Sequence, residues 1–106
     1  MLRTHFGYQK VYFKVIEYVE AQNKKELFYI KNGDIIESLD PLLSFSSAFT
    51  DRDGFFKCHR SYLVYIPNVD RFNAAEIVMR SGRTVPIARG YAKAFKEAYF
   101  NHMFRE

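Results

Sequence analysis

The sequence is poor in cysteine, tryptophan, proline and glycine. It has one cysteine, Cys58, no tryptophan, three prolines and five glycines. A single cysteine excludes an intramolecular disulfide, so we expect a reducing, cytoplasmic environment. No apolar run approaches the roughly 18 residues of a membrane-spanning helix, and the first residues lack the apolar segment of a signal peptide. We therefore expect a protein that uses neither a membrane nor a disulfide framework.

Catalytic and metal-binding motifs are missing as well. The histidines, His5, His59 and His102, are scattered, and no C-x-x-C pair accompanies them. The glycines form neither a phosphate-binding loop nor a nucleophile elbow. Cys58 and His59 are neighbours on an expected strand, so their side chains point to opposite faces and do not form a nucleophile–base pair. We expect no enzymatic activity, no cofactor and no metal.

Length and composition fit one folded domain over residues 1–106. Hydrophobic residues make up 48% of the chain and charged residues 26%, which excludes a disordered segment. Sixteen Lys and Arg against twelve Asp and Glu leave a formal net charge of +4. Between residues 71 and 90 the only acid is Glu76, whereas the cations are all arginine, whose planar fork of donors suits phosphates and base edges. This pattern favours a nucleic-acid partner, although a solvated basic face would look the same.

Strand-like alternation dominates the chain. Runs of β-branched and aromatic residues, bounded by turn residues, predict strands at 10–20, 27–31, 35–36, 55–58, 69–72, 76–80 and 84–87. Turns are predicted at 22–26, at Asn32-Gly33-Asp34, at 51–54 and at 81–83. Residues 61–65 fit a helix or a strand. A short helix is expected after Asp40-Pro41, and a C-terminal helix over 91–102 would bury Tyr91, Ala94, Phe95, Ala98 and His102.

Four segments of this chain, in order, resemble the LytTR-type DNA-binding domains of bacterial response regulators. The most specific is Phe55–Val64, FFKCHRSYLV, in which an aromatic and basic strand runs into His-Arg-Ser-Tyr. Ile16–Ala21 resembles the early strand of that family, Ser81–Arg89 its final hairpin, and Tyr91–Phe100 its terminal helix. The resemblance covers nearly the whole chain.

The resemblance implies a mainly β fold: an elongated arrangement of small antiparallel sheets with short helices, one of them C-terminal. It implies sequence-specific binding of duplex promoter DNA by loops that enter successive major grooves. Such sites are usually tandem repeats, so a second copy of the chain is an implied partner. A receiver domain precedes this domain in the full regulator. No receiver is present here, and the start close to the first strand favours an excised domain.

The resemblance also implies three groups of DNA-facing residues. The first is the loop containing Asn23, Lys24 and Lys25. The second is His59-Arg60-Ser61, in which Arg60 would bind guanine O6 and N7 and Ser61 would bind a phosphate. The third is Arg89, placed to reach a base edge, with amide groups near Gly90 and Tyr91 as additional phosphate contacts. Two departures from the family pattern, Tyr65 and Gly90, weaken the analogy, because glycine loosens the helix start beside Arg89.

Several of these residues have a second interpretation that the sequence leaves open. His59 could hydrogen-bond its own loop, Ser61 could cap a helical turn over 62–65, and Arg89 could simply be solvated. Arg80 and Arg83 flank a hairpin, where they would either follow phosphates or line a solvated edge.

Other side chains have plain structural interpretations. Lys93 and Lys96 are expected to be surface lysines, and Cys58 is expected to pack as a small apolar side chain. The nineteen aromatic residues are expected to fill the core rather than to stack on bases. Two other functional classes stay open at this point: an RNA or single-strand binder, and a protein-interaction module without nucleic acid.

Overall fold

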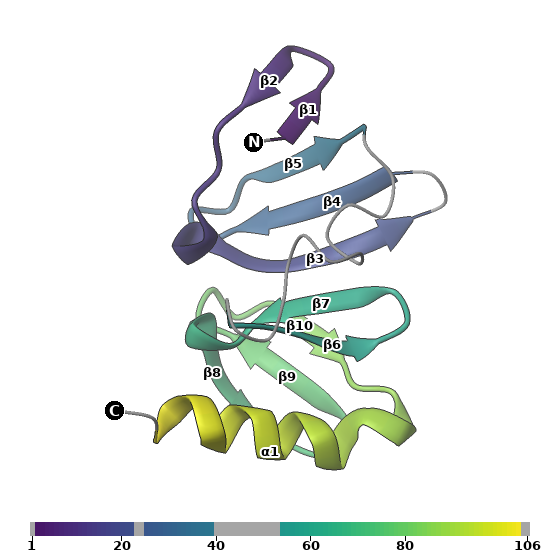
Figure 1. Ribbon diagram of the computed structural model, residues 1–106, viewed down its shortest axis with the longest axis vertical. Coiled ribbons are helices and arrows are strands. Elements are labelled where there is room, and N and C mark those ends of the chain that lie inside the picture. Colours follow the sequence, from purple (N-terminus) through teal and green to yellow (C-terminus); the bar gives the residue numbers. More distant parts are fainter. Residues whose placement is uncertain (1, 23–24, 40–53, 105–106) are drawn as a thin grey trace.

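The computed structural model describes residues 2–22, 25–39 and 54–104, and within them three antiparallel sheets and one α-helix. Figure 1 shows the sheets arranged along the longest axis, with the N-terminal hairpin at one end and the helix at the other. The principal extents are 38 × 28 × 26 Å. The predicted fold class, small antiparallel sheets with a C-terminal helix, is therefore confirmed.

The central element is a five-stranded sheet with the order β5-β4-β3-β7-β6. Its strands are β3 (Ile16–Gln22), β4 (Lys25–Ile30), β5 (Ile35–Ser38), β6 (Phe55–His59) and β7 (Tyr62–Tyr65). The ambiguous segment 61–65 is thus mainly strand. A short hairpin of β1 (Leu2–Thr4) and β2 (Gly7–Gln9) adjoins the β5 edge.

A three-stranded sheet and the helix form the other half of the molecule. The sheet consists of β8 (Val69–Phe72), β9 (Glu76–Met79) and β10 (Thr84–Pro86), and the helix is α1 (Ala92–Met103). Short 3-10 helices precede β3, β8 and α1, at Phe13–Val15, Ile66–Asn68 and Arg89–Tyr91. Among the described residues no helix is long and apolar enough to span a membrane.

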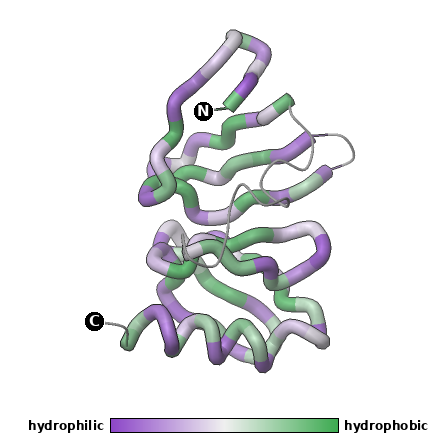
Figure 2. The backbone as a smooth tube through the Cα atoms, in the orientation of Figure 1, coloured by the Kyte–Doolittle hydropathy of each residue, from purple (hydrophilic) through white to green (hydrophobic). Residues whose placement is uncertain are grey.

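Two apolar cores lie on opposite faces of the five-stranded sheet. Along β3, Tyr18 belongs to one core and Val19 to the other, as the period of two in a strand requires. The first core holds the three-stranded sheet and α1 around Phe95, whose ring contacts Phe56 and Phe72 edge-on. Figure 2 shows hydrophobic segments in the central strands and alternation of hydrophobic and hydrophilic residues along α1. The prediction that aromatics fill the core is confirmed for these rings.

Four sequence predictions need correction in detail. Residues 10–15 are not part of the first long strand, because Phe13–Val15 form a 3-10 helix; the Asn68 side-chain amide donates to the carbonyl oxygens of Lys14 (3.0 Å) and Ile16 (2.8 Å) at its end. The predicted turn at 22–26 is too long, since Gln22 pairs with Lys25 and Glu26 is buried within β4. The β1–β2 hairpin was not predicted.

The third and fourth corrections concern a turn and a helix face. The turn predicted at Asn32-Gly33-Asp34 begins one residue earlier and covers 31–33, closed by Gly33 N–H to the Ile30 carbonyl (3.0 Å) with Gly33 at φ +102°. On α1, Ala94 is exposed, and Ala92 and Tyr99 share the inner face with Phe95 instead. The helix predicted after Asp40-Pro41 lies outside the described residues.

Candidate nucleic-acid interface

The most specific sequence motif forms the tip of the β6–β7 hairpin. His59 pairs with Tyr62 across the two strands, so Arg60 and Ser61 make the connection between them. The Ser61 N–H donates to His59 Nδ1 (3.1 Å), which closes the turn from within. Arg60 is exposed at the tip, whereas His59 and Ser61 are half-buried. The turn therefore presents the Arg60 guanidinium to solvent on a short, hydrogen-bonded support.

A second backbone hydrogen bond brings Arg89 to the same place. The Ala88 N–H donates to the carbonyl oxygen of Cys58 (3.0 Å), which joins the chain before α1 to the end of β6. Arg89 follows Ala88 and is exposed. Figure 1 shows the β6–β7 turn and the connection from β10 to α1 on the same side of the molecule, at the right. Arg60 and Arg89 thus lie on neighbouring segments of one surface.

A third hydrogen bond ties in the end of β3. The Ala21 N–H donates to the carbonyl oxygen of Ser61 (2.9 Å), one residue before Gln22 ends the strand. Asn23 and Lys24 lie outside the described residues. Lys25 begins β4, with its Nζ 3.6 Å from Glu37 Oε1. We call the surface formed by Ala21–Gln22, His59–Ser61 and Arg89–Gly90 the loop edge. It brings together the segments that carry two of the predicted groups, around Arg60 and Arg89, and the end of β3.

The hydrogen bond inside the turn determines which nitrogen of the neutral His59 ring carries the proton. Because Nδ1 accepts from Ser61, its lone pair is used and the proton of the neutral ring is on Nε2. The ring also meets Tyr62 edge-on, with 5.4 Å between centroids. The structural interpretation of His59 is confirmed. DNA contact stays a prediction that the same geometry permits, because Nε2–H is a donor that this bond does not use.

Arg83 was considered as a phosphate contact, but its side chain bonds to other parts of the protein. Its Nη1 donates to the Ile30 carbonyl (3.2 Å) and its Nη2 to the Gly33 carbonyl (2.8 Å), and the guanidinium lies 5.0 Å from the centre of the Tyr29 ring. Nη1 is also 3.8 Å from the fully buried carboxylate of Glu17. The partly exposed guanidinium thus joins the β9–β10 turn to the β4–β5 turn, and we leave it out of the interface.

Ser81 also bonds to Glu17, and Arg80 precedes Ser81 in the same turn. The Ser81 N–H and Oγ donate to Glu17 at 2.9 Å and 2.6 Å. We call Glu17, Ser81 and Arg83 the clasp. The clasp lies at the start of β3 and the loop edge at its end. Four residues of strand separate Glu17 from Ala21, which corresponds to about 13 Å. Arg80 is exposed beside Ser81, on the clasp side, and so we also leave it out of the proposed edge.

The remaining predicted positions are partly used by the fold itself. The Tyr91 N–H donates to the Ala88 carbonyl (2.8 Å), so this amide already has an acceptor, whereas Gly90 is exposed. The idea that Ser61 caps a helical turn is wrong, because Tyr62–Tyr65 is strand β7. Cys58 is fully buried, with its Sγ 3.6 Å from the Pro86 carbonyl, and burial raises the pKa of its thiol to about 12. Its prediction as a packed apolar side chain is confirmed.

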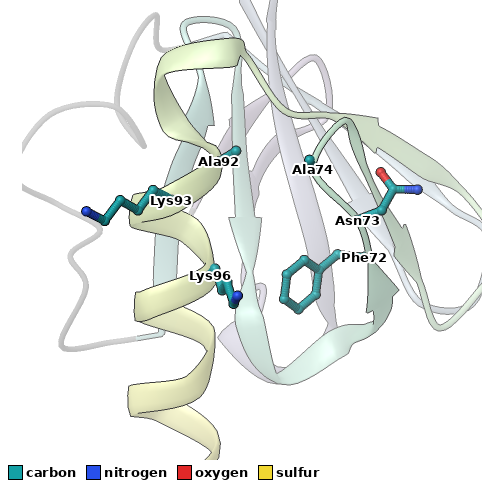
Figure 3. Close-up of a pocket in the computed structure, with 6 residues that line it drawn as sticks. All are labelled: Phe72, Asn73, Ala74, Ala92, Lys93 and Lys96. Atoms are coloured by element: carbon teal, nitrogen blue, oxygen red, sulfur yellow. The ribbon is translucent and has the colours of Figure 1, made fainter.

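A pocket of about 450 Å³ lies beside the loop edge, between the end of β8 and the first turns of α1. Figure 3 shows the Phe72 ring facing the helix, with Lys96 across from it and Lys93 pointing away. A hydrogen bond from the Ile87 N–H to the Ala75 carbonyl (2.9 Å) holds the β8–β9 turn against the chain that leads to Arg89. Both lysines are exposed, which confirms their prediction as surface residues, and they add positive charge to this part of the surface. The pocket is lined by Phe72, Asn73, Ala74, Ala92, Lys93 and Lys96.

Sequence reasoning missed the polar cluster behind the loop edge. The Tyr18 and Tyr29 rings stack with centroids 4.3 Å apart, and the Tyr29 hydroxyl donates to Glu20 Oε1 (3.0 Å). Burial raises the pKa of Tyr18, Tyr29 and Tyr62, in the case of Tyr29 to about 12. The only available signal was that the predicted strand carries Glu17 and Glu20 among apolar neighbours.

Comparison with known proteins agrees with this geometry. The family model described as LytTr DNA-binding domain matches residues 7–100. The transcriptional regulatory protein BtsR of Escherichia coli K12 is 34% identical over 86 residues, which are 76% of this chain and 30% of that protein. An uncharacterized response regulatory protein of Yersinia pestis is 29% identical over 96 residues, 86% of this chain and 40% of that protein.

The same comparison extends to a solved structure. A LytTr DNA-binding domain of a response regulator from Bacillus cereus superimposes with a TM-score of 0.74 at 25% identity, covering 92% of both chains. The overlap includes the sheets and the helix, so the arrangement of the elements is that of the solved domain. The chain spans about a third of the length of the curated relatives that it matches.

Proposed function

We propose, because this chain belongs to the LytTr DNA-binding domain family, that its loop edge binds specific sequences of double-stranded DNA. The observation that carries the proposal is the common location of Arg60 and Arg89. Both are exposed, and the hydrogen bonds Ala88 to Cys58 and Ala21 to Ser61 hold the segments beside each other. Two guanidinium groups on one rigid surface can contact one face of a duplex.

The binding mechanism follows from the chemistry of the edge. Phosphate contacts would position the domain, and base contacts would select the site. Arg60 and Arg89 each present a planar pair of donors that matches guanine O6 and N7 in the major groove. His59 Nε2–H, the Ser61 hydroxyl and the Gly90 segment are short-range donors for phosphates. We propose that the turn and the Arg89 segment enter successive major grooves, with Asn23, Lys24 and Lys25 contributing a third contact.

The relatives suggest the larger setting in which this domain works. Those that match are named as transcriptional or response regulatory proteins, and most of their length lies outside the match. We propose that this domain is the output part of such a regulator, preceded by a receiver domain, and that it acts on promoter DNA in the bacterial cytoplasm. Binding of a second copy to a tandem repeat is part of this proposal.

Selection of bound sites from a random pool of duplexes is the experiment that tests it. We expect a recovered consensus, with paired repeats one or two helical turns apart. On that consensus, Arg60→Ala and Arg89→Ala should each weaken binding by about 1–3 kcal/mol and relax the preference at one base pair. The slope of log affinity against log salt should be about −0.9 for each phosphate neutralised.

A matched control separates base reading from loss of charge. Arg71→Ala removes the same charge from β8, where Arg71 is 73% exposed and bonded to Asp70, and should leave the recovered sequence preference unchanged. Equal effects of all three substitutions would refute base reading at the loop edge. Displacement of the duplex by an unrelated single strand would favour an RNA or single-strand binder. Absence of any mobility shift at low salt would favour a protein-interaction module.

A further inference from the structure

The Asn73 side chain folds the β8–β9 turn by hydrogen bonding to two main-chain groups. Its Oδ1 accepts from the Ala75 N–H (2.8 Å) and from the Glu76 N–H (2.9 Å), and the Asn73 N–H donates to the Glu76 carbonyl (3.0 Å). Asn73 itself is exposed, and Figure 3 shows it with Ala74 across from Ala92 at the start of α1. One amide oxygen thus fixes the backbone of the connection between β8 and β9.

The folded turn presents a backbone acceptor to the chain that leads to the loop edge. The Ile87 N–H donates to the Ala75 carbonyl (2.9 Å), one step beyond the last pair of the β9–β10 register, Pro86 with Glu76. The Ala75 carbonyl and the Glu76 N–H belong to one planar peptide group, so the bond from that N–H to Asn73 Oδ1 sets the direction of the carbonyl. Asn73 therefore orients the acceptor that Ile87 uses.

Two different elements hold the two residues before Arg89. Ile87 is bonded to the β8–β9 turn, and the Ala88 N–H donates to the Cys58 carbonyl near the end of β6 (3.0 Å). The Tyr91 N–H then donates back to the Ala88 carbonyl (2.8 Å), which closes the 3-10 turn containing Arg89. The backbone that carries Arg89 is therefore held by β6 and by the β8–β9 turn.

We propose that Asn73 is a positioning residue for DNA recognition, which places Arg89 through the Ala75 carbonyl and the Ile87 N–H. The inference rests on the proposed function of the loop edge. Asn73 touches no DNA in this role. A guanidinium makes two parallel bonds to one guanine only when its backbone is held in place, so loss of this support reduces sequence preference more than it reduces binding to DNA in general.

Removal of the side-chain acceptor is the first test, at a temperature where all variants are folded. Asn73→Ala should weaken binding to the selected site about tenfold, within the range that loss of one base contact produces, and should leave binding to an unrelated duplex unchanged. Asn32→Ala is the matched control. Asn32 is also exposed, and its Oδ1 accepts the Asp34 N–H (2.8 Å) in the β4–β5 turn beside the clasp. The control should leave binding to both duplexes unchanged.

A conservative variant separates positioning from a direct contact with DNA. In Asn73→Asp a carboxylate oxygen can accept the same two N–H groups, so this variant should restore the ratio of selected-site to unrelated-duplex affinity. Its negative charge should weaken binding to both duplexes by the same factor, which the ratio removes. A contact from Asn73 Nδ2 to DNA predicts no such rescue.

A double-mutant cycle identifies the residue through which Asn73 acts. In an Arg89→Ala background, Asn73→Ala should have little further effect on binding to the selected site, because the side chain that it places is already missing. In an Arg60→Ala background, the effect of Asn73→Ala should remain at its full size, since the Arg60 turn is held by other bonds.

A measurement without DNA keeps this inference separate from the proposed function. Relative to the amides of β3, the Ile87 amide should exchange its hydrogen about tenfold faster in Asn73→Ala than in the unmodified chain, and at the normal rate in Asn73→Asp and Asn32→Ala. Unchanged exchange of Ile87, no rescue by Asn73→Asp, or an undiminished effect in the Arg89→Ala background would overturn the inference. Failure of the unmodified chain to bind any duplex would instead refute the proposed function.

Discussion

Replacing Arg83 with alanine tests the clasp, and the contacts of this one side chain allow the cost to be worked out. The substitution removes two hydrogen bonds, to the carbonyls of Ile30 (3.2 Å) and Gly33 (2.8 Å), and the cation above the Tyr29 ring. It also removes a positive charge 3.8 Å from the carboxylate of Glu17, whose side chain is 0% exposed.

The expected loss in the free energy of unfolding is about 3 kcal/mol. Breaking a buried ion pair by removing one partner costs about 3–5 kcal/mol, since the other charge is left in the interior. The lower end applies here because the Arg83 side chain is 22% exposed and Glu17 keeps both of its bonds to Ser81. The two lost bonds, about 1 kcal/mol each, are included in this figure rather than added to it.

Urea denaturation followed by circular dichroism measures this loss, and a thermal scan should show a melting temperature lower by roughly 15 °C. Arg80→Ala is the control, because it removes an exposed arginine from the same turn and should change stability by less than about 0.5 kcal/mol. At a temperature where it is folded, the Arg83→Ala variant should bind the selected DNA site with an unchanged salt slope. Stability within experimental error of the unmodified chain, or a reduced salt slope, would refute the assignment of Arg83 to the clasp.

Three further predictions concern residues outside the loop edge. Cys58, fully buried and with a pKa raised to about 12, should react with a thiol reagent only as fast as the domain opens, and labelling at the rate of a free thiol would contradict this. The pKa of Tyr29 is raised from 10.0 to about 12, so its stabilising contribution is complete below about pH 10 and is lost between about pH 10 and 12; urea midpoints at about pH 8 and pH 11 should show the decrease. Gly54→Ala should destabilise more than Gly82→Ala: both have positive φ, but at Gly54 a Cβ would lie 3.0 Å from Tyr65, whereas Gly82 faces open space. Equal urea midpoints would refute that packing argument.

Much of the fold could be predicted from local sequence patterns. The strands β6, β8, β9 and β10 follow from short runs of β-branched and aromatic residues bounded by turn residues. The helix α1 follows from its apolar spacing. One error occurred where a distant residue intervened: Asn68 binds the carbonyls of Lys14 and Ile16, and no pattern within residues 10–20 could show that.

The site was predictable in its residues but not in its layout. The resemblance pointed to the motif around Arg60 and to Arg89, which are 29 positions apart, but the bonds that place them together run through the backbone of Cys58, Ala88 and Ser61. Backbone hydrogen bonds between distant segments leave no side-chain signature. The role of Arg83 could not be predicted for a related reason. Its guanidinium donates to two main-chain carbonyls and forms an ion pair with a glutamate on another sheet.

The two acids of β3 lie near its two ends: Glu17 belongs to the clasp, and Glu20 lies near the loop edge. Glu17 is fully buried beside Ser81 and Arg83, whereas Glu20, three residues on, accepts from Tyr29 and Gln22. A solvated face would leave both carboxylates replaceable by any polar residue. In the structure each instead accepts from a residue outside β3, Glu17 from Ser81 and Glu20 from Tyr29, so a substitution at Glu17 should reduce stability without altering which DNA sequence is preferred. A substitution at Glu20, which is half-buried, should cause a smaller loss of stability, and urea denaturation of both variants measures the difference.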